Sequence, residues 1–209
     1  MSASAHATWR QAISELHTWK RGTERAVHKP LLLLWLLSWA GEGQGPEFAF
    51  ADIEEPLRDL LRDFGPPRKS FHPEYPFWHL QTSPLWEVLE AERFPLKKAG
   101  SSPTKTTLVG GDAVGQVPPE LWEAVSSDES LRSELVEALL AAFWPGSYHE
   151  ALRSALGLPE PESGLVTSTR RKRNPKFRET VLRAYGRACA VCGYHGRLGR
   201  DDLALEAAH

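Results

Sequence analysis

Two cysteines near the end of the chain have the spacing of a metal-binding turn. Cys189 and Cys192 are separated by two residues and followed by Gly193. A tight turn of this kind can direct two thiolates at one tetrahedral zinc ion. The residues that remain supply no matching Cys or His pair, so the spacing predicts half of a zinc site. A redox pair, which no thioredoxin-like alternation supports, and a pair without a chemical role stay open as alternatives.

The charge of the chain is unevenly distributed. Residues 165–200 carry ten Lys or Arg against one acid, Glu179, whereas residues 1–164 carry fifteen basic and twenty-three acidic residues, a balance of -8. A net-negative domain cannot hold DNA through a general attractive field, because the phosphates would be repelled. Any contact of the N-terminal part with DNA must therefore come from focal basic patches.

The elements that must position these residues are mostly helical. Apolar residues at helical spacing predict helices over residues 6–20, 30–40, 54–64, 85–92, 127–143 and 149–156, the first with Trp9, Ile13 and Leu16 on one face. Short strands are expected over residues 48–53 and 106–109, with a loop-and-strand stretch over 68–84 and a loop over 94–107. Ser126 and Glu129 have the pattern of a capping box for the helix over 127–143. The fold class is therefore α+β and predominantly helical.

The Leu-rich run over residues 30–40 is the longest apolar segment. A membrane span needs about 20 residues, so this run is expected to be a buried core helix. It also lies behind an amphipathic helix rather than a basic N-terminus, which is unlike a signal peptide. We therefore expect a cytoplasmic protein without a membrane partner, in which the two cysteines form no structural disulfide.

The C-terminal segment resembles the opening of an HNH nuclease. A basic helix from Asn174, the Cys189–Cys192 turn and then Glu206-Ala207-Ala208-His209 follow one another in that family's order. The resemblance implies a ββα-metal module that holds a divalent ion such as Mg²⁺ or Mn²⁺, with His209 as the general base toward water. The family also needs a downstream Asn and a second His. We therefore expect an incomplete module over 174–209 that binds no metal and does not cut DNA.

The N-terminal part resembles the sulfur-binding domain of phosphorothioate-dependent type IV restriction endonucleases. The resemblance rests on four motifs, which are His28-Lys29-Pro30-Leu31, Gly65-Pro66-Pro67-Arg68, His72-Pro73-Glu74-Tyr75-Pro76-Phe77-Trp78-His79 and Trp144-Pro145. It implies three parts: a reader of double-stranded phosphorothioate DNA over residues 1–158, a linker over 159–173 and the nuclease segment over 174–209. The sequence leaves the oligomeric state and the bases around the sulfur undetermined.

In that family the sulfur pocket is made by an aromatic-proline pair and a residue three further on. Trp144, Pro145 and Tyr148 match this pattern, although Tyr148 is larger than the small residue the family would have there. An apolar pocket accepts sulfur, whereas an anionic oxygen placed there would lose its water without replacement hydrogen bonds. The alternative for Trp144-Pro145 is a helix terminator packed on the core.

Basic and polar residues in loops and at element ends are candidates to hold the DNA around such a pocket. Cations clamp phosphates, and an Arg can also read guanine in the major groove. The candidates are Arg25, Lys29, Arg68, Lys69, Lys97, Lys98, Ser101 and Lys105. His72 and His79 are either further contacts or structural histidines, and Phe77 and Trp78 are expected in the core.

Two other functional classes remain to be weighed. A DNA reader or regulator without nuclease activity, whose C-terminal segment folds on metal, is the main rival. An enzyme acting on a small molecule is disfavoured because no nucleophile-base constellation and no phosphate-binding loop occur in the sequence.

Overall fold

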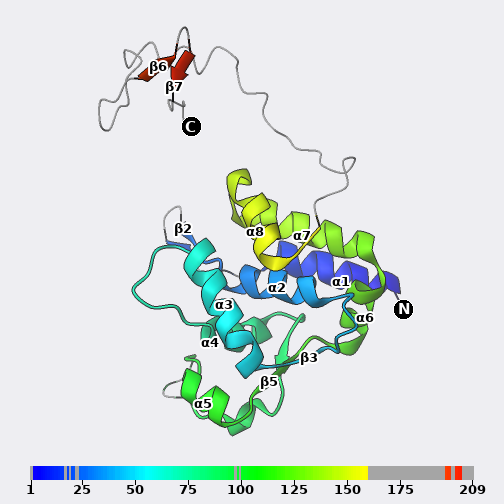
Figure 1. Ribbon diagram of the computed structural model, residues 1–209. Helices are drawn as coiled ribbons and strands as arrows, with labels where there is room; N and C mark the ends of the chain where they lie inside the picture. Colours follow the sequence, from blue (N-terminus) through cyan, green and yellow to red (C-terminus); the bar gives the residue numbers. More distant parts are fainter. Residues whose placement is uncertain are drawn as a thin grey trace. The chain divides into compact units, whose positions relative to one another are not determined.

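The computed structural model describes residues 2–16, 18, 20–21, 24–96, 98, 100–159, 196–198 and 201–203. The chain divides into two compact units, Met1–Pro161 and Glu162–His209 (Figure 1). The described residues of the first unit form the three-stranded sheet and eight α-helices, and they include the described part of the predicted DNA-binding region. The expectation of a predominantly helical α+β fold is confirmed for this unit.

A buried helix, α2 (His28–Trp39), forms the centre of the first unit. Leu31 to Leu34 and Leu36 are fully buried, because α2 is surrounded by α3 (Phe50–Phe64), α4 (Glu74–His79), α7 (Glu129–Phe143) and α8 (His149–Leu156). A helix that is apolar on all sides is stable only when it is covered on all sides. The prediction of a core helix in this run is therefore confirmed, and no described helix is long and apolar enough to cross a membrane.

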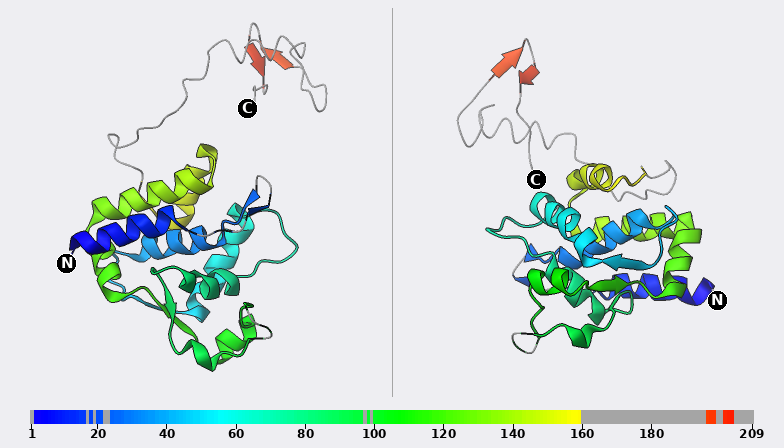
Figure 2. Two further views of the ribbon diagram at one scale, coloured as in Figure 1. Left: turned by 180° about the vertical axis from the view of Figure 1, so that it is seen from behind. Right: turned by 60° about the horizontal axis from the view of Figure 1, so that its bottom comes forward.

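Helix α1 (Ser2–Ser14) closes one side of this core by packing on α6 (Pro119–Ser127) and α7 (Figure 2). The indole N–H of the buried Trp9 donates to the carbonyl of Leu121 at 2.9 Å. The sequence predicted that this helix extends to Lys20, but it ends at Ser14. Lys20 instead belongs to β1 (Lys20–Arg21), which pairs with β2 (Glu24–Arg25) in an antiparallel hairpin.

A three-stranded antiparallel sheet in the order β3-β5-β4 flanks the helices. It consists of β3 (Glu47–Ala49), β5 (Val114–Gln116) and β4 (Glu87–Val88). Gly115 at its centre pairs with Phe48 and Val88, and the ring of Trp86 covers it so closely that a Cβ would lie 1.9 Å from Cζ2. Only glycine allows this approach of ring and backbone.

Several short elements differ from the sequence prediction because tertiary pairing decides them. The predicted strand over 48–53 is a strand only to Ala49, and α3 begins at Phe50. The predicted helix over 85–92 is instead β4 and a 3-10 turn, η2 (Ala91–Arg93), because Glu87 and Val88 pair with β5.

Two further segments predicted as extended or loop are helical. The stretch from Tyr75 to Gln81 forms α4 and the 3-10 turn η1 (Leu80–Thr82), with Phe77 and Trp78 buried as expected. The predicted strand over 106–109 is the helix α5 (Lys105–Gly110), whose N-cap hydroxyl on Thr104 accepts from the Thr107 amide at 3.2 Å.

The last helices of the unit start and stop near their predicted positions. Asp128, rather than Ser126, caps α7 by accepting from the Leu131 amide at 2.9 Å, because Ser126 lies within α6. Helix α8 spans the predicted residues, and Gly157 ends it with a left-handed φ of 63°. In the second unit, β6 (Gly196–Leu198) and β7 (Asp201–Leu203) pair antiparallel.

Candidate nucleic-acid interface

A cavity of about 720 Å³ opens where the start of α2, the loop after α3 and helix α4 meet. We call it the basic cavity because Lys29, Arg68 and Lys69 line it. Its other lining residues are Thr18, Ala26, His28, Ser70, His72, Tyr75, Pro76, His79 and Thr82. Three of the eight predicted DNA-binding residues thus meet in one hollow of a domain that is acidic overall.

The first turn of α2 directs His28 and Lys29 toward this cavity. The ammonium of Lys29 donates to the Thr82 hydroxyl at 2.9 Å, and that hydroxyl donates to the carbonyl of His79 at 3.0 Å. This relay joins α2 to the end of α4 and holds the Lys29 side chain in place. Partial burial lowers the pKa of Lys29 because it disfavours the charged ammonium. An anion that enters the cavity would stabilise the charge of this ammonium.

The loop after α3 adds Arg68 and Lys69 to the lining of the basic cavity. Gly65 ends the helix with its amide donating to the Leu61 carbonyl at 3.1 Å, and a Cβ on Gly65 would lie 2.3 Å from that oxygen. Pro66 and Pro67 then keep the chain from continuing the helix. Both cations are exposed and can approach a ligand as large as DNA.

Helix α4 supplies aromatic residues to the lining of the basic cavity. The Tyr75 ring is 44% exposed, and the His72 ring stacks on it with centroids 4.6 Å apart and planes 13° apart. The ring of His79 is tilted relative to that of Tyr75, with centroids 6.5 Å apart. Pro76, the next residue, is buried and lines the same cavity.

Two histidines of the basic cavity have pKa values below the ordinary value for histidine. Burial lowers the pKa of His28, and the nearby charge of Arg68 lowers it further. Burial also lowers the pKa of His79, with a further contribution from Lys29. The smaller contributions of Arg68 and Lys29 show that the cations of the basic cavity act on these two rings.

A second cavity of about 540 Å³ lies on the other side of Tyr75 and His79, which line both. Lys98 and Ser101, two more predicted DNA-binding residues, line the second cavity. Tyr75 and His79 therefore form a partition with predicted phosphate contacts on either side. Five predicted residues come together along this face.

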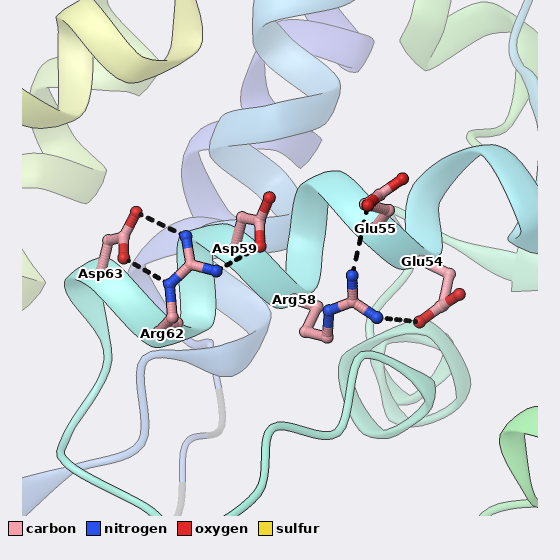
Figure 3. A network of polar contacts seen from close by, with 6 residues as sticks. All are labelled: Glu54, Glu55, Arg58, Asp59, Arg62 and Asp63. Carbon is pink, nitrogen blue, oxygen red and sulfur yellow. Dashed lines mark hydrogen bonds and ion pairs between the residues drawn. The ribbon is translucent and has the colours of Figure 1, made fainter.

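Lys105 lies apart from these five residues. Its ammonium lies 3.3 Å from Glu54 Oε1, at the start of the ion-pair network on α3 (Figure 3). In that network Arg58 pairs with Glu54 and Glu55, and Arg62 with Asp59 and Asp63. Lys105 lines neither the basic cavity nor the second cavity.

The predicted sulfur pocket at the end of α7 has other surroundings. Trp144 is 7% exposed, and its indole N–H donates to the Phe64 carbonyl at 3.0 Å. Tyr148, 45% exposed, lies in the 3-10 turn η3 (Gly146–Tyr148). Trp144 thus has the packing of a helix terminator on the core, and neither it, Pro145 nor Tyr148 lines the basic cavity or the second cavity.

The remaining predicted site residues lie outside the described parts. These are Lys97, Cys189, Cys192 and His209, together with the side chain of Arg25, whose backbone belongs to β2. Among the residues whose placement is described, no three His, Cys, Asp or Glu side chains are grouped to hold a metal ion. The zinc and nuclease predictions therefore stay predictions.

An aromatic-proline pair with a further aromatic ring three positions on occurs twice in the chain, and the sulfur pocket was predicted from only one occurrence. Tyr75, Pro76 and His79 have the same spacing as Trp144, Pro145 and Tyr148, and only the first set lines the basic cavity. Arg68 precedes Pro76 by eight positions, and Arg153 follows Pro145 by eight positions. A nearby cation in the sequence therefore does not distinguish the two sets.

One known protein family has a sequence profile that matches most of the chain. The sequence profile of the family described as ScoMcrA-like, DNA sulfur-binding domain, matches residues 6–161. No curated protein matches the chain.

Solved structures share the fold of the first unit. The sulfur-binding domain of ScoMcrA complexed with phosphorothioated DNA has a TM-score of 0.63 and 22% identity, over 71% of this chain and 94% of that one. The sulfur-binding domain of SprMcrA, also complexed with phosphorothioated DNA, has a TM-score of 0.61 and 21% identity, over 76% and 97%. The type IV phosphorothioation-dependent restriction endonuclease ScoMcrA has a TM-score of 0.58 and 21% identity, over 72% of this chain and 30% of its own.

Proposed function

The chain belongs to the ScoMcrA-like DNA sulfur-binding domain family, and from that premise we propose that it binds double-stranded DNA carrying a phosphorothioate in its backbone. The observation that carries this proposal is the basic cavity, in which Tyr75, Pro76 and His79 meet Lys29 and Arg68. A ligand suited to it combines a negative charge with a weakly hydrated, polarisable atom. A phosphorothioate diester has both properties.

We propose that Tyr75, Pro76 and His79 receive the sulfur. Sulfur is larger and less strongly hydrated than the oxygen it replaces, so it loses little when it is placed against an aromatic ring and a proline. An oxygen in the same position would lose water without gaining hydrogen bonds, at a cost of about 2 kcal/mol or more. These three residues therefore disfavour the binding of ordinary DNA as well as favour the binding of modified DNA.

The cations around this wall are proposed to hold the backbone. Lys29, Arg68 and Lys69 would contact the phosphates next to the sulfur, and Lys98 and Ser101 those beyond the Tyr75–His79 partition. Contacts of this type position a duplex without reading its bases. They would act equally on modified and unmodified DNA.

Competition binding with two duplexes that differ only in one stereodefined sulfur tests the proposal. We expect the sulfur duplex to bind about 30-fold more tightly, which corresponds to the desolvation cost above. Equal affinities would refute it and indicate a general DNA binder.

Two matched variants locate the sulfur. Tyr75→Ala and Tyr148→Ala each remove a tyrosine of similar exposure, 44% and 45%, from an aromatic-proline pattern. We expect only Tyr75→Ala to abolish discrimination. Loss in Tyr148→Ala instead would place the sulfur at Trp144, Pro145 and Tyr148.

The nuclease context is a separate proposal that rests on residues 174–209 alone. The basic segment from Asn174, Cys189 and Cys192, and His209 would belong to an HNH module that this domain targets to modified DNA, with zinc at the cysteines and Mg²⁺ or Mn²⁺ at the catalytic site. Zinc content of the purified chain, compared with a Cys189→Ser variant, tests the first part. Equal zinc in both would refute a zinc site at the cysteines, which the rival function, a reader whose C-terminal segment folds on metal, would also need.

A further inference from the structure

The Tyr75 ring is held by a hydrogen-bonded chain that runs through His72. Nδ1 of His72 lies 2.9 Å from Oε1 of Glu74, and Nε2 lies 2.9 Å from the Ser70 hydroxyl. One face of the imidazole ring stacks on the ring of Tyr75. Both nitrogens and one face of this ring therefore have a defined partner.

The donor and acceptor roles in this chain follow from chemistry. A carboxylate can only accept a hydrogen bond, so Nδ1 of His72 carries the proton and donates to Glu74. In the neutral ring Nε2 then accepts from the Ser70 hydroxyl. Glu74 is 8% exposed, and a buried carboxylate that lost this donor would be left without compensation.

Resting on the function proposed above, we propose that Glu74 is a positioning residue for sulfur recognition. It fixes the tautomer and plane of His72, and His72 in turn holds the Tyr75 ring in the partition between the two cavities. A fixed Tyr75 ring keeps the shape of the sulfur position constant. An oxygen placed there therefore cannot regain its water by displacing the ring. Glu74 thus sets selectivity and is not itself a phosphate contact.

Glu74→Ala tests this role in the full chain with the paired duplexes. We expect the preference for the sulfur duplex to fall by roughly threefold to tenfold, the range given by the stacking energy of an aromatic pair. Affinity for the unmodified duplex should not fall, because Glu74 also lines the second cavity and its replacement removes a negative charge from beside the proposed phosphate contacts. Glu74→Gln, whose amide oxygen can accept the same hydrogen bond, should retain most of the preference.

A double-mutant cycle shows whether Glu74 acts through His72. If it does, Glu74→Ala combined with His72→Ala loses no more preference than His72→Ala alone, because interacting residues are non-additive. Additive losses would refute the proposal. Should Glu74→Ala not fold, the exposed Ser70→Ala variant replaces it in the cycle, with a smaller loss expected.

The imidazole tautomer gives a readout that does not depend on DNA. Nitrogen NMR of neutral His72 should show the Nδ1–H form in the wild type and a shift toward Nε2–H in Glu74→Ala. An unchanged tautomer would overturn the positioning role even if sulfur binding is real. A wild type that binds both duplexes equally, with the expected tautomer, would instead refute only the function proposed above.

Discussion

Replacing Lys29 by Met should change the salt dependence of DNA binding by one phosphate contact. Met keeps the length and helix propensity of the side chain but removes its charge and its hydrogen bond to Thr82. The side chain lines the basic cavity at the first turn of α2. The substitution therefore removes a cation from the centre of the proposed interface and leaves the core unaltered.

The magnitude follows from counterion release. Each neutralised phosphate contributes about -0.9 to the slope of log K against log salt, so the slope should become shallower by about 0.9. Between 50 and 200 mM salt, the variant should lose roughly 3.5-fold less affinity than the wild type, since the salt concentration changes fourfold. The change should be the same for sulfur and unmodified duplexes, because a phosphate contact senses only charge.

Fluorescence anisotropy with a labelled duplex at four salt concentrations measures the slopes. Lys105→Met is the matched control, because that ammonium pairs with Glu54 instead, and its slope should equal that of the wild type. An unchanged slope for Lys29→Met, or an equal change for Lys105→Met, would show that the basic cavity is not where the duplex lies.

Three further outcomes are expected. Trp144→Ala should lower the free energy of unfolding by about 3–5 kcal/mol in urea denaturation, because a buried indole and its bond to Phe64 are lost; a stable variant that loses sulfur preference would contradict this. Lys98→Ala should weaken binding to both duplexes equally in the competition assay, and a selective loss for one would show that it does more than hold a phosphate. Thermal unfolding should occur at lower temperature as the pH falls from 7 to 5. The folded pKa of His28 lies below its ordinary value of 6.5, so the unfolded chain binds the proton more tightly. The fall should be smaller in His28→Gln, and an equal fall would mean that other groups cause it.

The arrangement of the cavities bears on how an acidic domain can bind DNA at all. Acidic residues such as Glu54, Asp59 and Asp63 are neutralised by arginines of the same helix in the ion-pair network (Figure 3). The cations of the basic cavity come instead from α2 and the loop after α3. Focal placement, which the charge balance required, is therefore achieved by bringing cations from different elements to one cavity, apart from the arginines of the ion-pair network.

The sequence alone determined the features that depend on near neighbours along the chain. The apolar run of α2 had to be buried whatever surrounded it, and α8 was bounded by Tyr148 and Gly157 as predicted. The motifs around His28, Arg68 and His72 were sufficient to indicate the sulfur-binding domain family. Each of these inferences uses residues within a few turns of one another.

Only the tertiary structure decided which of two equivalent patterns faces a cavity. Tyr75-Pro76 and Trp144-Pro145 share a spacing, but the contacts that distinguish them join distant residues. Trp144 bonds to Phe64, 80 residues away, and becomes part of the core. Lys29 reaches Thr82 across 53 residues, and Lys105 reaches Glu54 across 51. A side chain's exposure and charge partners depend on such long-range packing, which no local pattern records, so the sequence could name the candidate residues but could not sort them.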